Sequence, residues 1–265
     1  MTGRAGAPTL LLVGGPTALI GYGGLRLLTD PTFDPPGDYP RPGTPVVLHK
    51  LTKPAVRAEE LEPVDAVLIS HDHHSDNLDS AGREFLPRAG QVLTTGGGAE
   101  RLEVDATGLE PGDSVSLKRP EGPPVEVIAV RADHGPPEVA PKNGPVIGFV
   151  LRAEGEPTVY VSGDNASVEV VAEIAAEFGP FDSAVLFCGG AEVPEIWGEK
   201  VYLTLTPDTA VEVARLLGNA PIVPVHQEGW AHFSFGPDDL RQGFEEAGIG
   251  QRLRDVAPGQ QVPLA

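Results

Sequence analysis

The sequence is poor in cysteine, in basic side chains and in long apolar runs. The single Cys188 allows no internal disulfide, fits a reducing compartment, and is expected to be a small buried side chain. Only 19 Lys and Arg oppose 38 Asp and Glu, a formal net charge of −19 that repels nucleic acid and anionic membranes. The first apolar run is interrupted at residues 14–16, before it resembles a signal peptide. We expect a cytoplasmic protein with a small-molecule substrate and without nucleic-acid or membrane partners.

The length of 265 residues suits either two domains or one large α/β domain. Apolar residues make up 40% of the chain and charged residues 22%, as in ordinary globular proteins. Short strand-like and helical segments follow one another without a Pro/Ser-rich linker between them. We therefore predict one domain over residues 1–265, and the sequence alone does not indicate its oligomeric state.

Apolar runs bounded by glycine and proline predict many short strands, and the chain has 33 Gly and 28 Pro. The clearest runs lie at 9–13, 17–22, 25–30, 45–50, 65–70, 91–95, 125–130, 146–153, 158–163, 183–188 and 221–226. Apolar residues spaced by three and four predict helices over 167–179, 206–218 and 236–248, each ending at a glycine. A fourth helix is expected to begin near Asp76 or Asn77.

The window "ISHDHHSDNLD", residues 69–79, holds three of the seven histidines directly after an apolar run. In an extended chain, residues two apart point to the same side, so one ion can contact both His71 and His73. His74 then faces the other way unless the chain has already turned. Asp76 follows where the chain bends, which lets its carboxylate reach back toward the same place.

Three further predicted strands end just before a potential metal ligand, namely His134, Asp164 and His226. Strand ends are where open sheets assemble sites, because the scaffold fixes the backbone while the following loop presents a side chain. Imidazoles and carboxylates together suit zinc, iron or manganese. The sequence therefore predicts one shared metal centre.

The motifs "HDHHSD", "ADHGP", "SGD" and "PVH", in this order, resemble those of metallo-β-lactamase-fold hydrolases. The branch most similar is that of ascorbate-6-phosphate lactonase, and the opening segment "VGGPTALIGYGGLRLLTDPTF" resembles the start of that branch. The resemblance implies an α/β fold, a four-layer αβ/βα sandwich with two mixed sheets packed face to face and helices outside.

Carried over to this sequence, the resemblance implies a first metal at His71, His73 and His134 and a bridging Asp164. Asp76 and His226 would bind a second metal. The usual family pattern is H-x-H-x-D-H, whereas this chain has one more residue before the aspartate and then Asn77.

An alternative alignment, without the insertion, places Ser75 and Asp76 at the last two positions of the motif. A histidine is missing in both alignments. The second site is therefore weak, differently built, or completed by His74.

Such a centre predicts a hydrolase, because a divalent cation lowers the pKa of water to about 7 and stabilises charge on a carbonyl or phosphoryl oxygen. We expect one or two ions, zinc in the first place, with manganese and iron as alternatives. Asp76 is the candidate to orient the water, and His232 the candidate to assist the leaving oxygen. The expected substrate is a small or medium ester-like compound, a lactone or a phosphodiester.

Simpler interpretations compete at several positions. Asn77 is favoured as a helix N-cap, and Asp30 as a turn residue before Pro31 over a partner that orients a ligand histidine. His74 and His232 are either substrate contacts or loop residues. Trp230 and Phe233 are favoured as packing residues. The "TTGGGAE" segment at 94–100 is interpreted as a turn, and no role is assigned to His49.

Two other functions remain open. A degenerate site of the same fold would bind a metal or a ligand without hydrolysis. A nuclease would need a basic groove, which the charge of −19 opposes.

Overall fold

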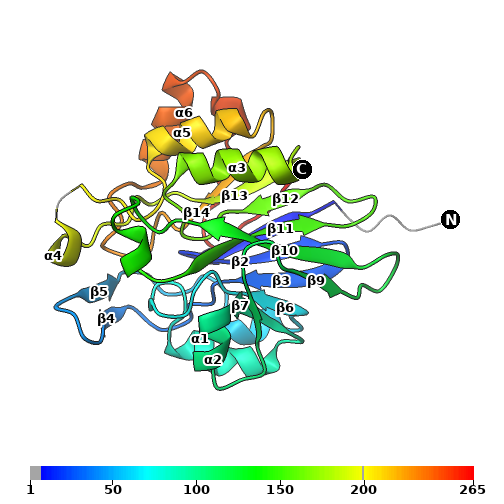
Figure 1. The fold of residues 1–265 in the computed structure, drawn as a ribbon, viewed down its shortest axis with the longest axis horizontal. Helices are drawn as coiled ribbons and strands as arrows, with labels where there is room; N and C mark the ends of the chain where they lie inside the picture. The colour runs from blue at the N-terminus through cyan, green and yellow to red at the C-terminus, as the bar shows by residue number, and fades with distance from the viewer. Residues whose placement is uncertain (1–6, 199) are drawn as a thin grey trace.

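Two β-sheets lie face to face, and helices cover both outer sides (Figure 1). The computed structural model describes residues 7–198 and 200–265. One sheet consists, in spatial order, of β15 (Gln261–Pro263), β1 (Thr9–Gly14), β2 (Thr17–Tyr22), β3 (Leu25–Thr29), β6 (Ala66–Leu68), β7 (Val92–Thr95) and β8 (Thr107–Leu109). The other consists of β14 (Ile222–Val225), β13 (Ser183–Phe187), β12 (Val159–Val161), β11 (Val146–Arg152), β10 (Val125–Ala132) and β9 (Ser114–Leu117). A separate antiparallel ribbon is formed by β4 (Gly37–Pro40) and β5 (Val47–Lys50).

The helices form the two outer layers. The first layer, against the seven-stranded sheet, holds α1 (Ser80–Phe85) and α2 (Gly96–Arg101). The second, against the six-stranded sheet, holds α3 (Val168–Phe178), α5 (Pro207–Leu216) and α6 (Pro237–Glu246), while the short α4 (Pro194–Trp197) lies apart (Figure 1). Among the described residues, no helix has both the length and the apolar character needed to cross a bilayer. The arrangement confirms the predicted four-layer αβ/βα sandwich.

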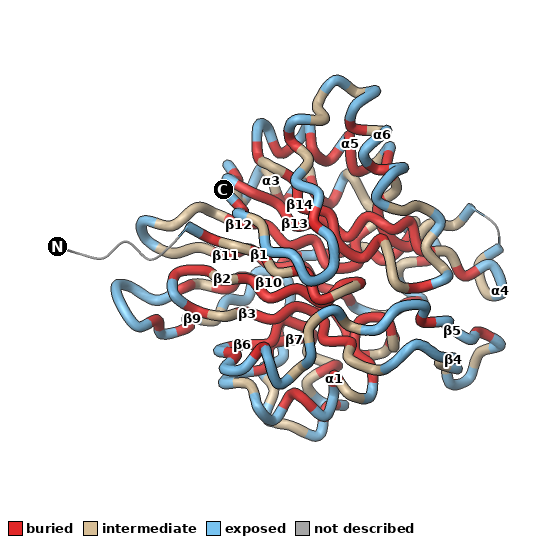
Figure 2. Tube along the Cα trace, turned by 180° about the vertical axis from the view of Figure 1, so that it is seen from behind, coloured by how far each residue is buried: buried red, intermediate tan, exposed pale blue. Residues whose placement is uncertain are grey.

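The interior strands of both sheets are buried along most of their lengths, as Figure 2 shows. In β10, Val127 and Ala129 point into the core between the sheets, whereas Ile128 and Val130 contact the helix layer. Because neighbouring side chains of a strand point to opposite faces, a strand between two apolar layers must be apolar at nearly every position. This requirement explains the continuous apolar runs of the sequence.

Several strands end at one edge of the molecule. β12, β13 and β14 are parallel, and β10 has the same direction because the intervening β11 is antiparallel to both β10 and β12. In the other sheet β3 and β6 are parallel. The loops after β6, β10, β12 and β14 carry most of the predicted ligands, so the topology brings them together.

Two local predictions were wrong. α1 does not begin at Asp76 or Asn77, because its N-cap is Asp79, whose carboxylate accepts the Gly82 N–H. Residues 94–100 are not a simple turn: Thr95 ends β7 and caps α2 by accepting the Gly98 N–H. The other three helices were predicted within about two residues, whereas β4, β8, β9 and β15 had no clear sequence signal.

Candidate metal centre

His71 follows β6 and is held from behind by a buried polar chain. Its Nδ1 lies 3.0 Å from the Ser70 hydroxyl oxygen. The backbone N–H and the hydroxyl of Ser70 donate to Asp30 Oδ1 at 2.7 and 3.0 Å. Asp30 is therefore more than the turn residue favoured from the sequence, since it fixes His71 through Ser70. Burial, with the nearby Asp164 charge, raises the pKa of Asp30 well above its usual value.

The chain bends directly after β6, and this bend changes the expected roles of the next histidines. β6 ends at Leu68, so the alternation that placed His71 and His73 on one side no longer applies. His74 is buried, and its Nδ1 lies 2.8 Å from His71 Nε2. His73 is 25% exposed, and its Nε2 donates to the backbone carbonyl of Asn143. Potential ligand atoms of the three histidines nevertheless lie within 4.8 Å of one another.

A first group with a carboxylate joins His71, His134 and Asp164, whose ligand atoms also lie within 4.8 Å of one another. Nδ1–H of His134 donates to the carbonyl of Leu203 at 2.8 Å. Since a neutral imidazole carries one proton, this bond leaves Nε2 of His134 with its lone pair. Asp164 Oδ2 lies 4.0 Å from Nε2 of His71 and 3.7 Å from Nδ1 of His134.

A second group joins Asp76, Asp164 and His226. Nδ1 of His226 lies 3.1 Å from Asp164 Oδ1, and Nε2 lies 3.4 Å from Asp76 Oδ2. Asp164 thus belongs to both groups. The structure brings together all six residues predicted as ligands from segments far apart in the sequence.

Asn77 is not the predicted helix cap. Its side-chain amide is fully buried and donates to Asp164 Oδ1 at 3.2 Å. In the alignment with an inserted residue, the position of the usual histidine is therefore held by a residue that contacts the shared carboxylate. Sequence reasoning missed this contact, because a cap and an inward-pointing amide have the same local pattern of Asn before an apolar residue.

His226 has a left-handed backbone, with φ of 55°. Such a conformation is uncommon outside glycine, costs about 1–3 kcal/mol, and persists only where the surroundings enforce it. Here the His226 N–H donates to the Gly15 carbonyl at 2.8 Å, and the ring packs on Phe233 with centroids 4.6 Å apart. In this conformation the imidazole of His226 points toward Asp76 and Asp164.

His232 contacts the centre from outside it, with Nε2 at 3.0 Å from Asp76 Oδ2. Trp230 is a packing residue, as expected, because it is 3% exposed and its ring centroid is 5.8 Å from that of Tyr39. Phe233 packs against both His226 and His232, and the buried Cys188 belongs to the core beneath the helix layer. His49 is exposed and paired with Asp38.

The buried charges are distributed unevenly over the centre. Burial, reinforced by neighbouring imidazoles, holds the pKa of His71 and His74 well below the usual value. Burial also lowers the pKa of His226, but Asp164 and Asp76 outweigh it and raise that pKa to about 10. Burial opposes ionisation of Asp76, yet His232 and His226 bring its pKa well below the usual value. The imidazoles therefore favour the ionised form of Asp76, as a cation site requires.

Several buried atoms of the centre have no hydrogen-bond partner among the described residues, among them Nε2 of His74 and Oδ2 of Asp164. A buried polar atom without a partner costs free energy, so native proteins satisfy such atoms with protein groups, water or an ion. Lone pairs on imidazole nitrogen and carboxylate oxygen are what a divalent transition metal binds. The residues present fit a metal ion.

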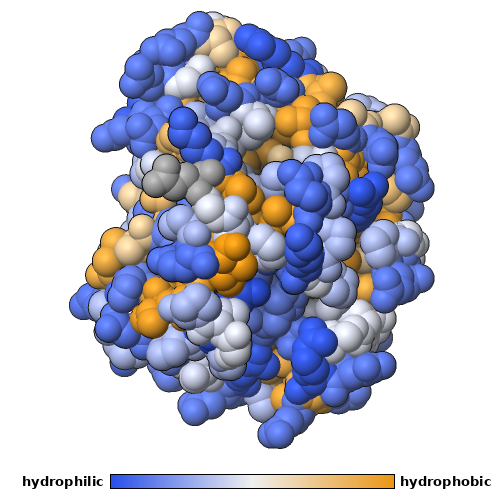
Figure 3. Space-filling view, turned by 60° about the vertical axis from the view of Figure 1, so that its left-hand side comes forward, coloured by the Kyte–Doolittle hydropathy of each residue, from blue (hydrophilic) through white to orange (hydrophobic). Residues whose placement is uncertain are grey.

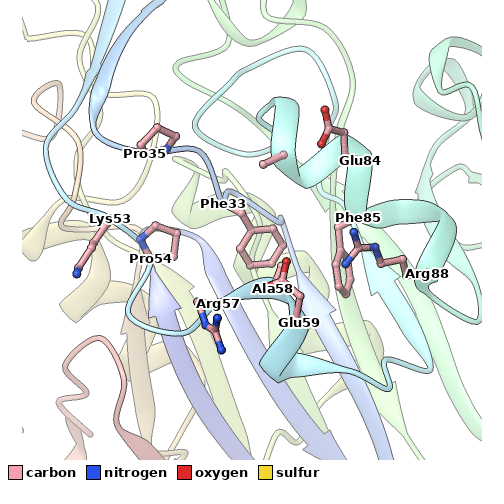
Figure 4. A pocket seen from close by; sticks show the side chains of 11 residues that line it. Phe33, Pro35, Lys53, Pro54, Arg57, Ala58, Glu59, Glu84, Phe85 and Arg88 are labelled. Carbon is pink, nitrogen blue, oxygen red and sulfur yellow. The ribbon is translucent and has the colours of Figure 1, made fainter.

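The cavity shown in Figure 4 is separate from this centre. It has a volume of about 380 Å³ and lies against α1, between Phe33, Phe85 and the basic side chains Lys53, Arg57 and Arg88. None of the predicted ligands lines it. A smaller cavity of about 230 Å³ is lined by His232 and therefore adjoins the centre.

A sandwich of two mixed sheets with a His/Asp centre at the strand ends defines the metallo-β-lactamase fold. Residues 25–227 match the family model described as "Beta-lactamase superfamily domain", so the chain belongs to this superfamily, as the sequence motifs predicted. The lactonase branch remains a prediction.

Among similar proteins, an uncharacterized protein of Mycobacterium tuberculosis is 28% identical over 258 residues, covering 94% of this chain. This chain spans 64% of the length of that relative. The isothiocyanate hydrolase from Delia radicum gut bacteria superposes with a TM-score of 0.81 at 22% identity, covering 96% of this chain and 98% of the other. A possible metal-dependent hydrolase from Veillonella parvula superposes with a TM-score of 0.82 at 18% identity, covering 98% and 100%. These superpositions support the fold.

Proposed function

We propose that the protein is a metal-dependent hydrolase that cleaves an ester-like bond in a small or medium-sized molecule. The observation that carries the proposal is Asp164, whose carboxylate belongs to both groups of potential ligands. A carboxylate placed in this way can bridge two cations, the arrangement that metal-dependent hydrolysis uses to hold an attacking and a leaving oxygen. The similar structures named as hydrolases support the same function.

The first ion is assigned to His71, His134 and Asp164, with a further imidazole from His73 or His74. The second is assigned to Asp76, Asp164 and His226. Zinc is the expected metal, and manganese or iron would suit the same donors. When bound, the cation acts as a Lewis acid that lowers the pKa of water to about 7 and polarises a carbonyl or phosphoryl oxygen.

Asp76 and His232 are the residues placed to move protons. Asp76 Oδ2 lies 3.0 Å from His232 Nε2 and 3.4 Å from His226 Nε2, so this carboxylate can orient a water molecule and accept its proton. The hydrogen bond to Asp76 occupies Nε2 of His232 and fixes its ring. Nδ1 of His232 has no partner among the described residues. When the ring carries a proton on both nitrogens, the Nδ1–H can pass its proton to the leaving oxygen, and the proton that Asp76 takes from the water remains shared between Asp76 and Nε2 of His232.

The proposed substrates are lactones and phosphodiesters. A small-molecule substrate without nucleic acid is in keeping with the net charge of −19. Isothiocyanates should also be tested, because the structure is similar to that of the isothiocyanate hydrolase from Delia radicum gut bacteria.

The test is to measure metal content and turnover on the same metal-loaded preparation. We expect one or two equivalents of metal by elemental analysis and hydrolysis of at least one compound in a panel of lactones, carboxylic esters, phosphodiesters and isothiocyanates. Asp164→Asn keeps the side-chain size but removes the shared charge, so it should lower metal content and reduce turnover by at least about 10–100-fold. The control is Asp105→Asn, an exposed position, which should match the parent.

Hydrolysis by the chelated, metal-free protein, or full activity in Asp164→Asn, would contradict the proposal. The alternative of a binding protein without hydrolase activity rests on the altered Asp76–Asn77 region, which lacks the histidine of the family motif in both alignments. Stoichiometric metal without turnover of any panel member would favour that alternative.

A further inference from the structure

The smaller cavity, here called the side cavity, begins where the metal centre ends. His232 contacts Asp76 of the centre through Nε2 and also lines this cavity of about 230 Å³. Its other walls come from β5, from residues 192–195 and from Ala231. A group bound in the side cavity would therefore be next to the residue that protonates the leaving oxygen in the proposed function.

The walls of the side cavity are tied together by backbone hydrogen bonds. The Ala231 N–H donates to the His49 carbonyl at 3.0 Å, and the Glu192 N–H donates to the His232 carbonyl at 2.9 Å. An isolated β-bridge also pairs Lys50 with Trp230. The segment around His232 thus lies between the β4–β5 ribbon and the chain at 191–192, so the cavity is a preformed part of the fold.

This part of the molecule faces the reader in Figure 3, which brings forward the side that carries β4, β5 and α4 in Figure 1. Hydrophobic residues form several separate patches there, divided by hydrophilic ones. Separate patches of this kind suit small apolar groups of a ligand.

The lining of the side cavity is apolar and acidic. Val46, Leu48 and Val193 are buried apolar side chains in its wall. Its charged members are Glu192 and Glu195, and no Lys or Arg belongs to the described lining. His49 also lines it, but its ring is already paired with a carboxylate.

The chemistry of this lining selects against negative charge. An apolar wall favours an alkyl group by burial. A carboxylate raises the energy of an anion nearby, and the effect is strongest where the walls exclude water. The Glu192 side chain is held in place by hydrogen bonds that its oxygens accept from the Ser234 hydroxyl and the Lys200 N–H.

We propose, on the basis of the proposed function, that the side cavity holds the leaving group of the substrate. This leaving group is an alkyl group without negative charge. The inference narrows the substrate class: esters and lactones with apolar, neutral or cationic leaving portions are accepted, and those with phosphate or carboxylate on the leaving portion are disfavoured.

The experiment uses three alcohols with tetrahedral heads that differ in charge: 3,3-dimethylbutanol, choline and 2-hydroxyethanesulfonate. Binding of each to the full-length, metal-loaded protein is measured by calorimetry. Turnover of the butanoate ester of each alcohol is measured in parallel. We expect the neutral and cationic alcohols to bind at least about tenfold more tightly than the sulfonate, and the esters to follow the same order.

Glu195→Gln tests whether the cavity causes this order. Removing this exposed carboxylate should narrow the difference between the neutral and the anionic compound, while Glu177→Gln, the same change on the exposed face of α3, should leave it intact. A leucine-to-phenylalanine change, Leu48→Phe, fills the cavity and should weaken binding of 3,3-dimethylbutanol.

The binding and turnover measurements test the cavity assignment and the hydrolase proposal separately. If the alcohols bind in the expected order but no ester is cleaved, the hydrolase proposal fails and the cavity assignment stands. If the esters are cleaved without regard to charge, or if binding of the alcohols is unchanged in both Glu195→Gln and Leu48→Phe, the cavity assignment is overturned.

Discussion

His226 shows how one residue can combine a strained backbone with an unusual protonation state. Two carboxylates, Asp164 and Asp76, surround its ring at 3.1 and 3.4 Å and outweigh the burial that opposes its charge. The metal-free protein therefore holds a buried imidazolium between two carboxylates. A divalent cation and this proton compete for the same lone pairs.

Metal binding is expected to release a proton from His226. With a pKa of about 10, its ring is protonated in the metal-free protein at pH 8 and must lose that proton to become a ligand. Calorimetric titration with zinc in buffers of different ionisation enthalpy should show about one proton released per second-site ion at pH 8. The release should decline as the pH rises toward 10. A binding enthalpy that is independent of the buffer would contradict the assignment.

At the scale of elements, the β4–β5 ribbon is fixed to α1 by one buried ion pair. Nζ of Lys50, in β5, lies 3.1 Å from Oδ2 of Asp79, the N-cap of α1, and both side chains are buried. Asp79 also accepts the backbone N–H groups of Phe33 and Asp34. Three separate segments of the chain therefore share one carboxylate.

Lys50→Met is expected to destabilise the fold in a pH-dependent manner. The change leaves the Asp79 carboxylate buried without its cation, a loss of about 3–5 kcal/mol at pH 8. Burial already raises the pKa of Asp79 despite Lys50, and the variant raises it further. Because the folded state then holds a proton that the unfolded state releases, the destabilisation shrinks as the pH falls through this raised pKa.

Urea unfolding of the parent and of Lys50→Met at pH 8 and pH 5 measures this difference. Lys53→Met, at an exposed position nearby, is the matched control and should leave stability nearly unchanged. An equal loss of stability at both pH values would show that Asp79 is not the cause.

Elements with a strong local pattern were predictable from the sequence, whereas the bend at the centre was not. α3, α5 and α6 have an apolar stripe and a terminal glycine, and the interior strands are apolar throughout. The chain after β6 leaves the extended conformation within two residues, and this turn places His74 inside and His73 at the rim. Its cause is tertiary, since Asp72 is held in place by Arg101 from α2, with Nε 2.9 Å from Oδ2.

At the scale of the whole molecule, the metal centre joins the two sheets. His71 and Asp76 follow β6 of one sheet, whereas His134, Asp164 and His226 follow strands of the other. The strand ends could be predicted to meet because parallel strands finish at the same edge. Their distances could not, since they depend on how closely the sheets pack.

Removing the metal should therefore lower the stability of the whole fold. A ligand at about 1,000 times its Kd stabilises the folded state by about 4.1 kcal/mol, which for a domain of this size raises Tm by roughly 8–16 °C. Thermal unfolding with and without a chelator, followed by addition of zinc, measures the shift. An unchanged Tm would show that the centre does not hold a metal tightly.

The left-handed backbone at His226 has a consequence for the residues that could replace it. Asparagine and glycine adopt that conformation more readily than histidine does. Selection for thermal resistance alone would favour them here, and each would discard an imidazole from the centre. At position 226, stability of the fold therefore favours one residue type and the metal centre another. The histidine present is the residue that the metal centre requires.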